Sequence, residues 1–219
     1  MKCKNRALCN GLAFLLLFAV WTVLVQTVDV QPAGETGKTV GFATVNSWFH
    51  QLTGVNLLLY AVTDWLGLIP VFVCLLFGVL GLAQLIQRKS LLKADPDLIL
   101  LGIYYVLVIA GYLIFEMYPI NYRPIFIEGR LEASYPSSTT LLVLSVMPTL
   151  IFQADRRARR PEVKRAVRIL TILFSLAMVM GRLVSGVHWM TDIIGSVLLS
   201  CGLFLIYQAS VLFCDGKEV

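Results

Sequence analysis

Six apolar runs, each close to the length of a membrane-spanning helix, constrain this chain more than any other feature of its sequence. A helix needs about 20 apolar residues to cross the hydrocarbon core of a bilayer, because each residue advances it by only about 1.5 Å. The runs extend approximately over residues 7–28, 64–86, 98–116, 137–153, 167–185 and 189–207. We therefore expect an all-α protein, a six-helix integral membrane bundle that forms a single domain over residues 1–219.

The composition supports this expectation and excludes several other classes. Hydrophobic residues make up 58% of the chain and charged residues 14%, with a mean hydropathy of +0.80. A soluble domain has roughly 45–50% apolar and about 25% charged residues, so disorder, fibrous structure and nucleic-acid binding are disfavoured. The five cysteines show no paired spacing, which indicates neither a disulfide framework nor a thiolate metal site. We expect no metal, no cofactor and no obligate protein partner.

The basic residues set the expected orientation. If both termini lie on one side, that side carries 14 of the 18 Lys and Arg residues. These are Lys2, Lys4, Arg6, Arg88, Lys89, Lys93, Arg156, Arg157, Arg159, Arg160, Lys164, Arg165, Arg168 and Lys217. The positive-inside rule then predicts cytoplasmic termini in a multi-pass cell-membrane protein, and the compact length is compatible with a bacterial inner membrane. The first run could also be a cleavable signal peptide, because basic residues precede it, although no small-residue cleavage site ends it.

The segment over residues 30–54 follows the first run on the outer side. Trp48, Phe49 and Leu52 stand there among polar residues, which predicts a short amphipathic helix lying in the interface, with a plain loop as the alternative. Asp64 stands at the outer end of the second run. It could be a functional intramembrane carboxylate or a residue that caps a helix start.

Three polar groupings fall at the outer ends of the runs and therefore belong to one leaflet. They are Glu116, Asn121, Tyr122, Arg123 and Pro124; residues 134–140; and Arg182, His188 and Asp192. Lys38, Arg123, Arg130 and Arg182 are the four basic residues that face outward, against the topology rule. A planar guanidinium suits bidentate contact with phosphoryl oxygens, although Arg123 and Arg182 could instead reach toward lipid headgroups.

The spacing of His188 and Asp192 favours nucleophilic chemistry. The two residues are four apart, so a helix that begins near His188 places both side chains on one face. A carboxylate beside one ring nitrogen selects the tautomer and leaves the other nitrogen free to attack. Asp192 could instead only complement the helix dipole. The segment 135–140 suits a helix start rich in hydroxyls, and such an end also binds anions.

These residues resemble the motifs of a known family. Arg182-x5-His188-x3-Asp192, with Gly186 two residues before the histidine, resembles the third motif of the type 2 phosphatidic acid phosphatase superfamily, SR-x5-H-x3-D, with Gly181 in place of the serine. Arg123-Pro124 resembles the end of the first motif, K-x6-RP, and residues 136–139 align with the second, PSGH. The motif region spans residues 116–192, about a third of the chain.

The resemblance implies roles for the matching positions. His188 would be the nucleophile that takes the phosphoryl group, and Asp192 would orient it. The groups that would bind the phosphate are Arg123, Arg182, Ser137, Ser138 and Thr139.

Two positions depart from the family pattern. Glu116 stands where the lysine of the first motif should be, and Thr139 stands where the general-acid histidine of the second should be. Thr139 cannot act as an acid near neutral pH, and an ionised Glu116 would repel phosphate. Glu116 could instead pair with Arg123 or stay protonated in a desolvated site. His50, the other histidine, could supply the missing acid.

The sequence therefore predicts a metal-independent membrane lipid phosphatase. We expect it to hydrolyse an undecaprenyl-pyrophosphate-like or phosphatidate-like lipid on the outer leaflet through a phosphohistidine intermediate, with the lipid phosphate and membrane lipids as its partners. Two rival interpretations are a non-catalytic pseudoenzyme that binds lipid phosphates and a transferase that moves the phosphoryl or head group to another acceptor.

Overall fold

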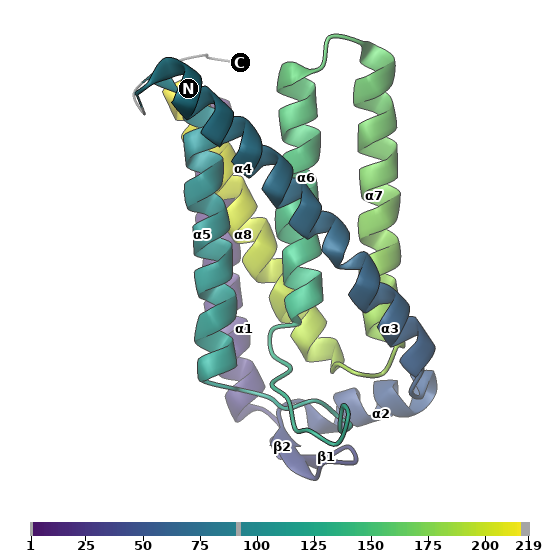
Figure 1. Cartoon of the computed structure of the whole chain (residues 1–219). Coiled ribbons are helices and arrows are strands. Elements are labelled where there is room, and N and C mark those ends of the chain that lie inside the picture. Colours follow the sequence, from purple (N-terminus) through teal and green to yellow (C-terminus); the bar gives the residue numbers. More distant parts are fainter. Residues whose placement is uncertain (1, 91–92, 216–219) are drawn as a thin grey trace.

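The computed structural model describes residues 2–90 and 93–215, and it is an all-α bundle with one small hairpin (Figure 1). Within those residues, six helical stretches are long and apolar enough to cross a membrane, which confirms the expected bundle. The elements are α1 (Lys2–Thr27), β1 (Gln31–Ala33), β2 (Lys38–Val40), α2 (Ala43–Thr53), α3 (Leu57–Leu66), α4 (Leu68–Arg88), α5 (Pro96–Met117), α6 (Ser138–Arg157), α7 (Pro161–Val184) and α8 (Met190–Cys214).

The second span begins earlier than expected. Helices α3 and α4 together form one apolar stretch, Leu57–Arg88, and the side chain of Asn56 caps its start by accepting from the backbone N–H of Leu59 at 2.9 Å. Asp64 therefore lies inside α3, and the expectation that it caps a helix start is wrong. The fifth span also begins earlier, at Pro161, because proline is favoured in a first helical turn.

The segment between the first two spans contains the expected short helix. Helix α2 exposes Trp48 and Leu52, whose side chains are 61% and 67% accessible, while Asn46 on the same helix is buried. The antiparallel pair β1–β2 precedes α2 and was not expected. The segment between the first two spans is thus a hairpin followed by an amphipathic helix, with exposed apolar side chains of the kind that contact lipid.

Helix α1 packs closely along α8. A Cβ on Gly202 would lie 2.6 Å from the side chain of Leu15, and one on Gly11 would lie 2.9 Å from Ile206, so glycines allow the two helices to approach. The indole of Trp21 also donates to the backbone oxygen of Thr191 at 3.1 Å. Helix α1 is therefore a packed member of the bundle.

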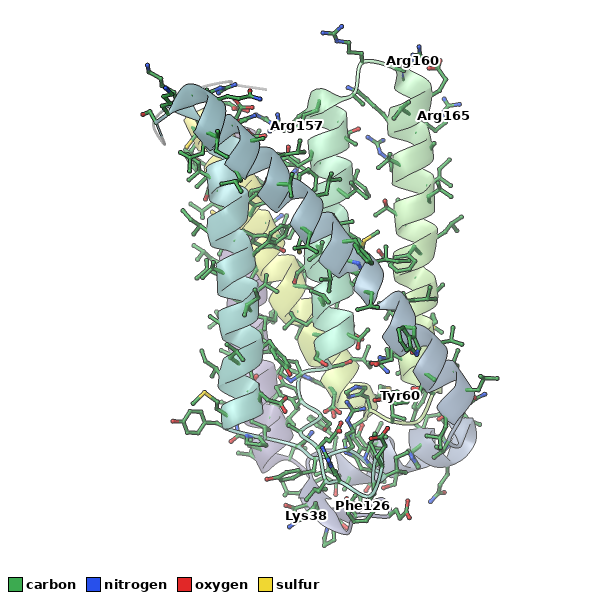
Figure 2. All side chains as sticks on the ribbon, in the orientation of Figure 1. Lys38, Tyr60, Phe126, Arg157, Arg160 and Arg165 are labelled. Carbon is green, nitrogen blue, oxygen red and sulfur yellow. The ribbon has the colours of Figure 1, made fainter. Side chains whose placement is uncertain are left out.

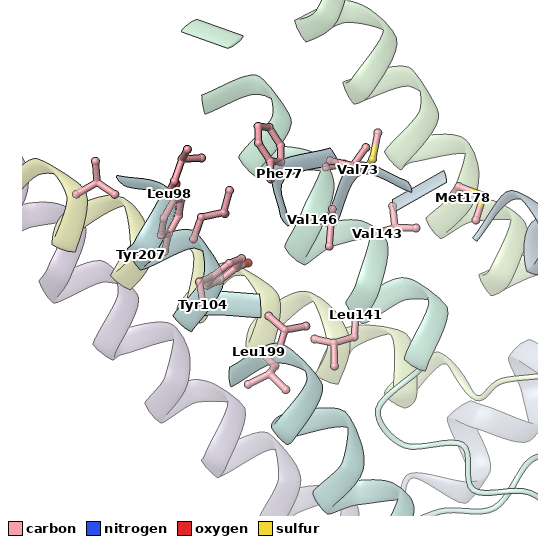
Figure 3. Packing of buried hydrophobic residues seen from close by; sticks show 14 residues of the cluster. Val73, Phe77, Leu98, Tyr104, Leu141, Val143, Val146, Met178, Leu199 and Tyr207 are labelled. Atoms are coloured by element: carbon pink, nitrogen blue, oxygen red, sulfur yellow. The ribbon is translucent and has the colours of Figure 1, made fainter. Parts of the chain in front are cut away.

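The core lies between α4, α5, α6 and α8, with Met178 of α7 at its side (Figure 3). Two buried polar side chains inside it are paired, as a low-dielectric interior favours. The Tyr104 hydroxyl donates to the backbone oxygen of Ser145 at 2.8 Å, and the Gln153 amide donates to the Tyr207 hydroxyl at 2.8 Å. Helices α6 and α8, which carry the second and third motifs at their starts, are therefore held rigidly.

The two ends of the bundle differ in character. The start of α1, the end of α8 and the α6–α7 connection lie at one end, while α2, the hairpin and the connection from α5 to α6 lie at the other (Figure 1). The first end carries basic side chains such as Arg157, Arg160 and Arg165 (Figure 2). There Arg156 and Arg157 pair with Asp97 at 3.3 and 2.7 Å. The three polar groupings meet at the opposite end.

Candidate active site

His188 lies in the short connection between α7 and α8, and its side chain is almost fully buried. Its Nδ1 is 3.2 Å from the backbone oxygen of Ser134 and 3.7 Å from Oδ2 of Asp192. A carbonyl oxygen can only accept, so this contact assigns the ring hydrogen to Nδ1 and leaves a lone pair on Nε2. Nε2 has no hydrogen-bond partner within the described part of the chain.

Asp192 is fully buried and accepts two hydrogen bonds. One comes from the backbone N–H of Trp189 at 2.9 Å, which caps the start of α8, and the other from the side-chain amide of Asn121 at 3.2 Å. The carboxylate therefore fixes the connection that carries His188 as well as standing beside the ring. Asp192 therefore both caps α8 and lies near the histidine. The group that directly accepts from Nδ1 of His188 is the Ser134 carbonyl.

Helix α2 packs against this connection. Gly186 has φ of +70°, and a Cβ there would lie 2.0 Å from the backbone oxygen of Gly54, so only glycine fits. The His50 ring is 3.1 Å, through Nε2, from the backbone oxygen of Gly186. Asn46 donates to the Thr191 hydroxyl at 3.0 Å. These contacts therefore tie helix α2 both to the connection that carries His188 and to the start of α8.

Arg123 and Arg182 converge beside His188, although they are 59 positions apart in the sequence. Both are buried, and their guanidinium carbons lie 5.5 and 4.8 Å from the ring centre of Tyr60. The Arg182 Nη2 donates to Asp64 at 2.7 Å and to the Thr139 hydroxyl. Two of the four basic residues for which the topology rule predicts the outer side thus belong to this cluster and do not extend toward headgroups.

Arg123 pairs with a carboxylate that the sequence did not single out. Its Nε is 3.1 Å from Oε2 of Glu132, and its backbone N–H donates to the backbone oxygen of Glu132 at 3.1 Å. Glu132 is therefore the carboxylate that pairs with Arg123, a role that the sequence analysis offered as one alternative for Glu116. No ion pair involves Glu116 within residues 2–90 and 93–215, and this residue is exposed.

Several buried polar atoms of this cluster lack a protein partner. Among the described residues, the atoms of this cluster that make no hydrogen bond are Nε and Nη1 of Arg123, Nε and Nη1 of Arg182, Oγ of Ser134 and Nε2 of His188, although Nε of Arg123 lies within ion-pair distance of Glu132. Leaving a buried donor unpaired costs about 1–3 kcal/mol, and more for a charged group, so such atoms are rare away from functional sites. Mostly cationic donors beside a free imidazole nitrogen suit an anionic ligand.

A pocket of about 220 Å³ joins His188, Arg123 and Ser134, whereas Arg182 lies outside its lining. It is lined by Tyr112, Phe115, Glu116, Arg123, Glu132, Ala133, Ser134, Tyr135, Pro136, Ser138 and His188. The other candidates lie outside this lining. Ser137 donates its hydroxyl to Thr140 at 3.1 Å, Thr139 contacts Arg182, and His50 lies against Gly186. Of the three hydroxyl residues proposed to hold phosphate, Ser138 lines this pocket, whereas Thr139 lines a neighbouring apolar pocket and contacts Arg182.

The surroundings of His188 keep its ring neutral. Burial is the main cause that lowers the pKa of His188 well below its ordinary value of 6.5, and the positive charges of Arg123 and Arg182 lower it further. A neutral imidazole with Nε2 unprotonated is the nucleophilic form.

The chain belongs to the PAP2 superfamily, whose family model matches residues 70–213, about two thirds of the sequence. No curated protein matches significantly. Among solved structures, a transmembrane PAP2-type phosphatidylglycerolphosphate phosphatase from Bacillus subtilis is similar, with a TM-score of 0.66 at 16% sequence identity. The match covers 95% of this chain and 97% of that one. At this identity the likeness supports the transmembrane fold, and family membership supports a membrane lipid phosphatase in general terms.

Proposed function

We propose that this protein hydrolyses a lipid pyrophosphate or lipid phosphate through a phosphohistidine formed on His188. The observation that carries the proposal is the unpartnered Nε2 of His188, which faces a pocket shared with Arg123, Ser134 and Ser138. In the first step Nε2 would attack the terminal phosphorus, and the bond from phosphorus to the bridging oxygen would break. In the second step water would displace the histidine, which releases inorganic phosphate and restores the neutral ring.

The charged groups would stabilise the transferring phosphoryl group. Arg123 and Arg182 present free nitrogens toward the cluster, and fixed cationic donors of this kind act where negative charge accumulates. Asp192 and the Ser134 carbonyl would hold the ring of His188 in its tautomer. Burial and both arginines lower the pKa of His188, so its ring is uncharged at neutral pH. An uncharged ring is consistent with the proposed tautomer.

A hydrocarbon chain would lie next to the phosphate. An apolar pocket of about 300 Å³ between α3, α4, α5 and α6 shares Tyr112 and Ser138 with the phosphate pocket. A lipid could therefore place its head group beside His188 and the first part of its tail between these helices. The lateral position of this pocket supports a lipid substrate over a soluble phosphate ester.

The preferred substrate would be a pyrophosphate. Thr139 cannot protonate a leaving group, its hydroxyl contacts Arg182, and His50 is not among the residues that line the pocket. A monoester expels an alkoxide whose conjugate acid is about as weak as water, with a pKa of roughly 15.7. A pyrophosphate expels a lipid phosphate, whose relevant pKa is about 6, so it departs with little protonation. An undecaprenyl-pyrophosphate-like lipid fits this chemistry.

The site would face the outer leaflet, with both termini in the cytoplasm. The end of the bundle opposite the site carries the basic α6–α7 connection, and the positive-inside rule places such a connection in the cytoplasm (Figure 2). The protein would then be a multi-pass component of the cell membrane, acting on lipids of the cell envelope.

The test is phosphate release from purified protein with farnesyl pyrophosphate and farnesyl monophosphate as a matched pair. We expect faster turnover of the pyrophosphate by wild type and no turnover by His188→Ala. Glu116 and Thr139 replace the lysine and the general-acid histidine of the family motifs, which favours a pseudoenzyme that only binds lipid phosphates as the second candidate. Binding without phosphate release would identify it. Release that requires an added alcohol acceptor would identify a transferase.

A further inference from the structure

A second apolar pocket, of about 350 Å³, lies between α4 and α5 and has no part in the reaction proposed above. One side of it is formed by residues 74–85 of α4, and the other by residues 94–105, most of them in α5. Phe77 and Leu98, which line it, are buried members of the core (Figure 3). The wall of this pocket is therefore a fixed part of the fold.

The second apolar pocket continues the first one, the apolar pocket of about 300 Å³ beside the phosphate pocket. On α4 the lining passes from Val71 in the first pocket to Cys74 in the second. On α5 it passes from Val108 in the first pocket to Tyr105 in the second. Residues three apart share a helix face and lie about 4.5 Å apart along the axis. The two pockets therefore lie end to end, and Tyr112 connects the first of them to the phosphate pocket.

Three glycines leave space open in the second pocket. A Cβ on Gly78, Gly81 or Gly102 would meet no atom of another helix within 4 Å in the described part of the chain. Glycine in the middle of a helix costs about 1 kcal/mol relative to alanine. At Gly202 close packing against α1 accounts for the glycine, but no such contact accounts for these three. Open space of this kind suits an apolar ligand.

Charged groups bound the far end of the second pocket. Ala94 lines that end, and the next residue, Asp95, forms an ion pair with Arg88 at 2.8 Å. A hydrocarbon chain would stop short of this pair, because covering charged groups with apolar atoms is costly. Helix α5 rises about 21 Å between Leu98 and Tyr112, which sets the length of the two pockets together.

We propose that the hydrocarbon tail of the substrate occupies both apolar pockets and that the second pocket selects for long tails. This inference rests on the proposed function and specifies its substrate as a lipid whose tail runs about 20 Å along α4 and α5. The two helices approach each other at the basic end of the bundle and diverge toward the site (Figure 1). Tyr112 and Ser138 line both the phosphate pocket and the first apolar pocket. This continuity assigns the space to the tail of the substrate, and not to a membrane lipid or a second copy of the chain.

The kinetic test compares geranyl and geranylgeranyl pyrophosphate on the full-length protein. The geranylgeranyl chain is twice as long, so it alone would extend past Tyr105 into the second pocket. In Gly78→Leu and Gly102→Leu the new side chain would fill that pocket. We expect the ratio of kcat/KM for geranylgeranyl over geranyl pyrophosphate to fall at least about tenfold, because one methylene in an apolar pocket already discriminates by about tenfold or more.

Ala110→Leu is the matched control, since Ala110 is exposed on α5 and lines neither apolar pocket. Partitioning into detergent is the same for every variant, so a change in the ratio reports on the protein. Leucine is favoured over glycine in a helix, so both glycine variants should unfold at or above the temperature of wild type. An unchanged ratio in both, with His188→Ala inactive, would overturn this inference and leave the phosphohistidine mechanism standing.

A photolabelling measurement decides the inference without turnover. The probe is a geranylgeranyl methylenediphosphonate, which cannot be hydrolysed at its bridge, with a diazirine at the end of its tail. We expect label on Leu82 or Leu98 of wild type, removed by unlabelled probe but not by excess phospholipid, and lost in Gly102→Leu. Label displaced by phospholipid, or carried on a second copy of the chain, would overturn the inference. The expected label without any phosphate release would retain the tail site and refute the proposed phosphatase activity.

Discussion

Replacing Arg182 by methionine should abolish catalysis while leaving the fold intact. The guanidinium is 1% exposed, and its Nε and Nη1 have no partner among the described residues. If both donate to the phosphoryl group, each charge-assisted bond is worth about 1.5–3 kcal/mol, and the loss is about 3–6 kcal/mol of transition-state stabilisation. We therefore expect kcat/KM on a lipid pyrophosphate to fall by about 10²–10⁴-fold.

The same change should have little effect on stability. Methionine fills the space of the arginine stem, and removing a buried cation relieves its desolvation penalty. The Asp64 side chain, which loses its partner, is 57% exposed, so the pair contributes at most about 1 kcal/mol. For a chain of this size that amounts to a shift of about 2–4 °C in the unfolding midpoint at most.

Phosphate release and thermal unfolding of the same detergent-solubilised samples provide the assay, with Arg130→Met as the control. Arg130 is exposed in the connection between α5 and α6 and does not line the pocket. The reasoning is refuted if Arg182→Met keeps kcat/KM within about tenfold of wild type. It is also refuted if the variant unfolds far below wild type, since its inactivity would then reflect a lost fold.

Four further predictions concern orientation, protonation and the role of the Asp192 carboxylate. A single cysteine placed at Arg159 should resist an impermeant thiol reagent in intact cells, because the positive-inside rule predicts a cytoplasmic α6–α7 connection; labelling there would reverse the proposed orientation. Modification of His188 by diethyl pyrocarbonate in a His50→Asn background should keep its full rate as pH falls through 6.5, because burial and the arginines lower the pKa of His188; a midpoint at 6.5 or above would contradict this. Folding stability should decline below that pH, where the unfolded chain binds a proton that the buried ring does not. Asp192→Asn should retain a measurable fraction of turnover that His188→Ala lacks, since the Ser134 carbonyl still holds Nδ1, and equal loss in both variants would argue against it.

The spans could be predicted from the sequence because each is a local property. About 20 apolar residues in succession have few alternatives in a bilayer, and all six runs correspond to helices. The start of the second span could not be placed, because Asp64 was treated as a boundary. Its charge is tolerated inside α3 by Arg182, a partner 118 positions away. The hairpin β1–β2 was missed for a similar reason, since three-residue strands carry almost no periodic signal.

The residues of the site likewise divide into those that local sequence predicts and those that depend on distant contacts. His188 and Asp192 are four residues apart on a predictable helix start, so their proximity follows from local geometry. The Ser134 carbonyl that contacts His188 is a backbone group, which any residue supplies, so no sequence pattern identifies it. Glu132 pairs with Arg123 across a loop with no regular period, and an acidic loop residue is ordinarily just solvated. Tyr60, which both arginines contact, was hidden within an apolar stretch.

The central claim is that Nε2 of His188 accepts the phosphoryl group, and trapping that intermediate tests it most directly. Wild type would be mixed with farnesyl pyrophosphate labelled at the terminal phosphorus, quenched in alkali and digested, with His50→Asn as the matched control. The account predicts acid-labile, alkali-stable label on the peptide that contains His188, in wild type and in His50→Asn but not in His188→Ala. Label on any other residue, or full turnover by His188→Ala, would contradict it.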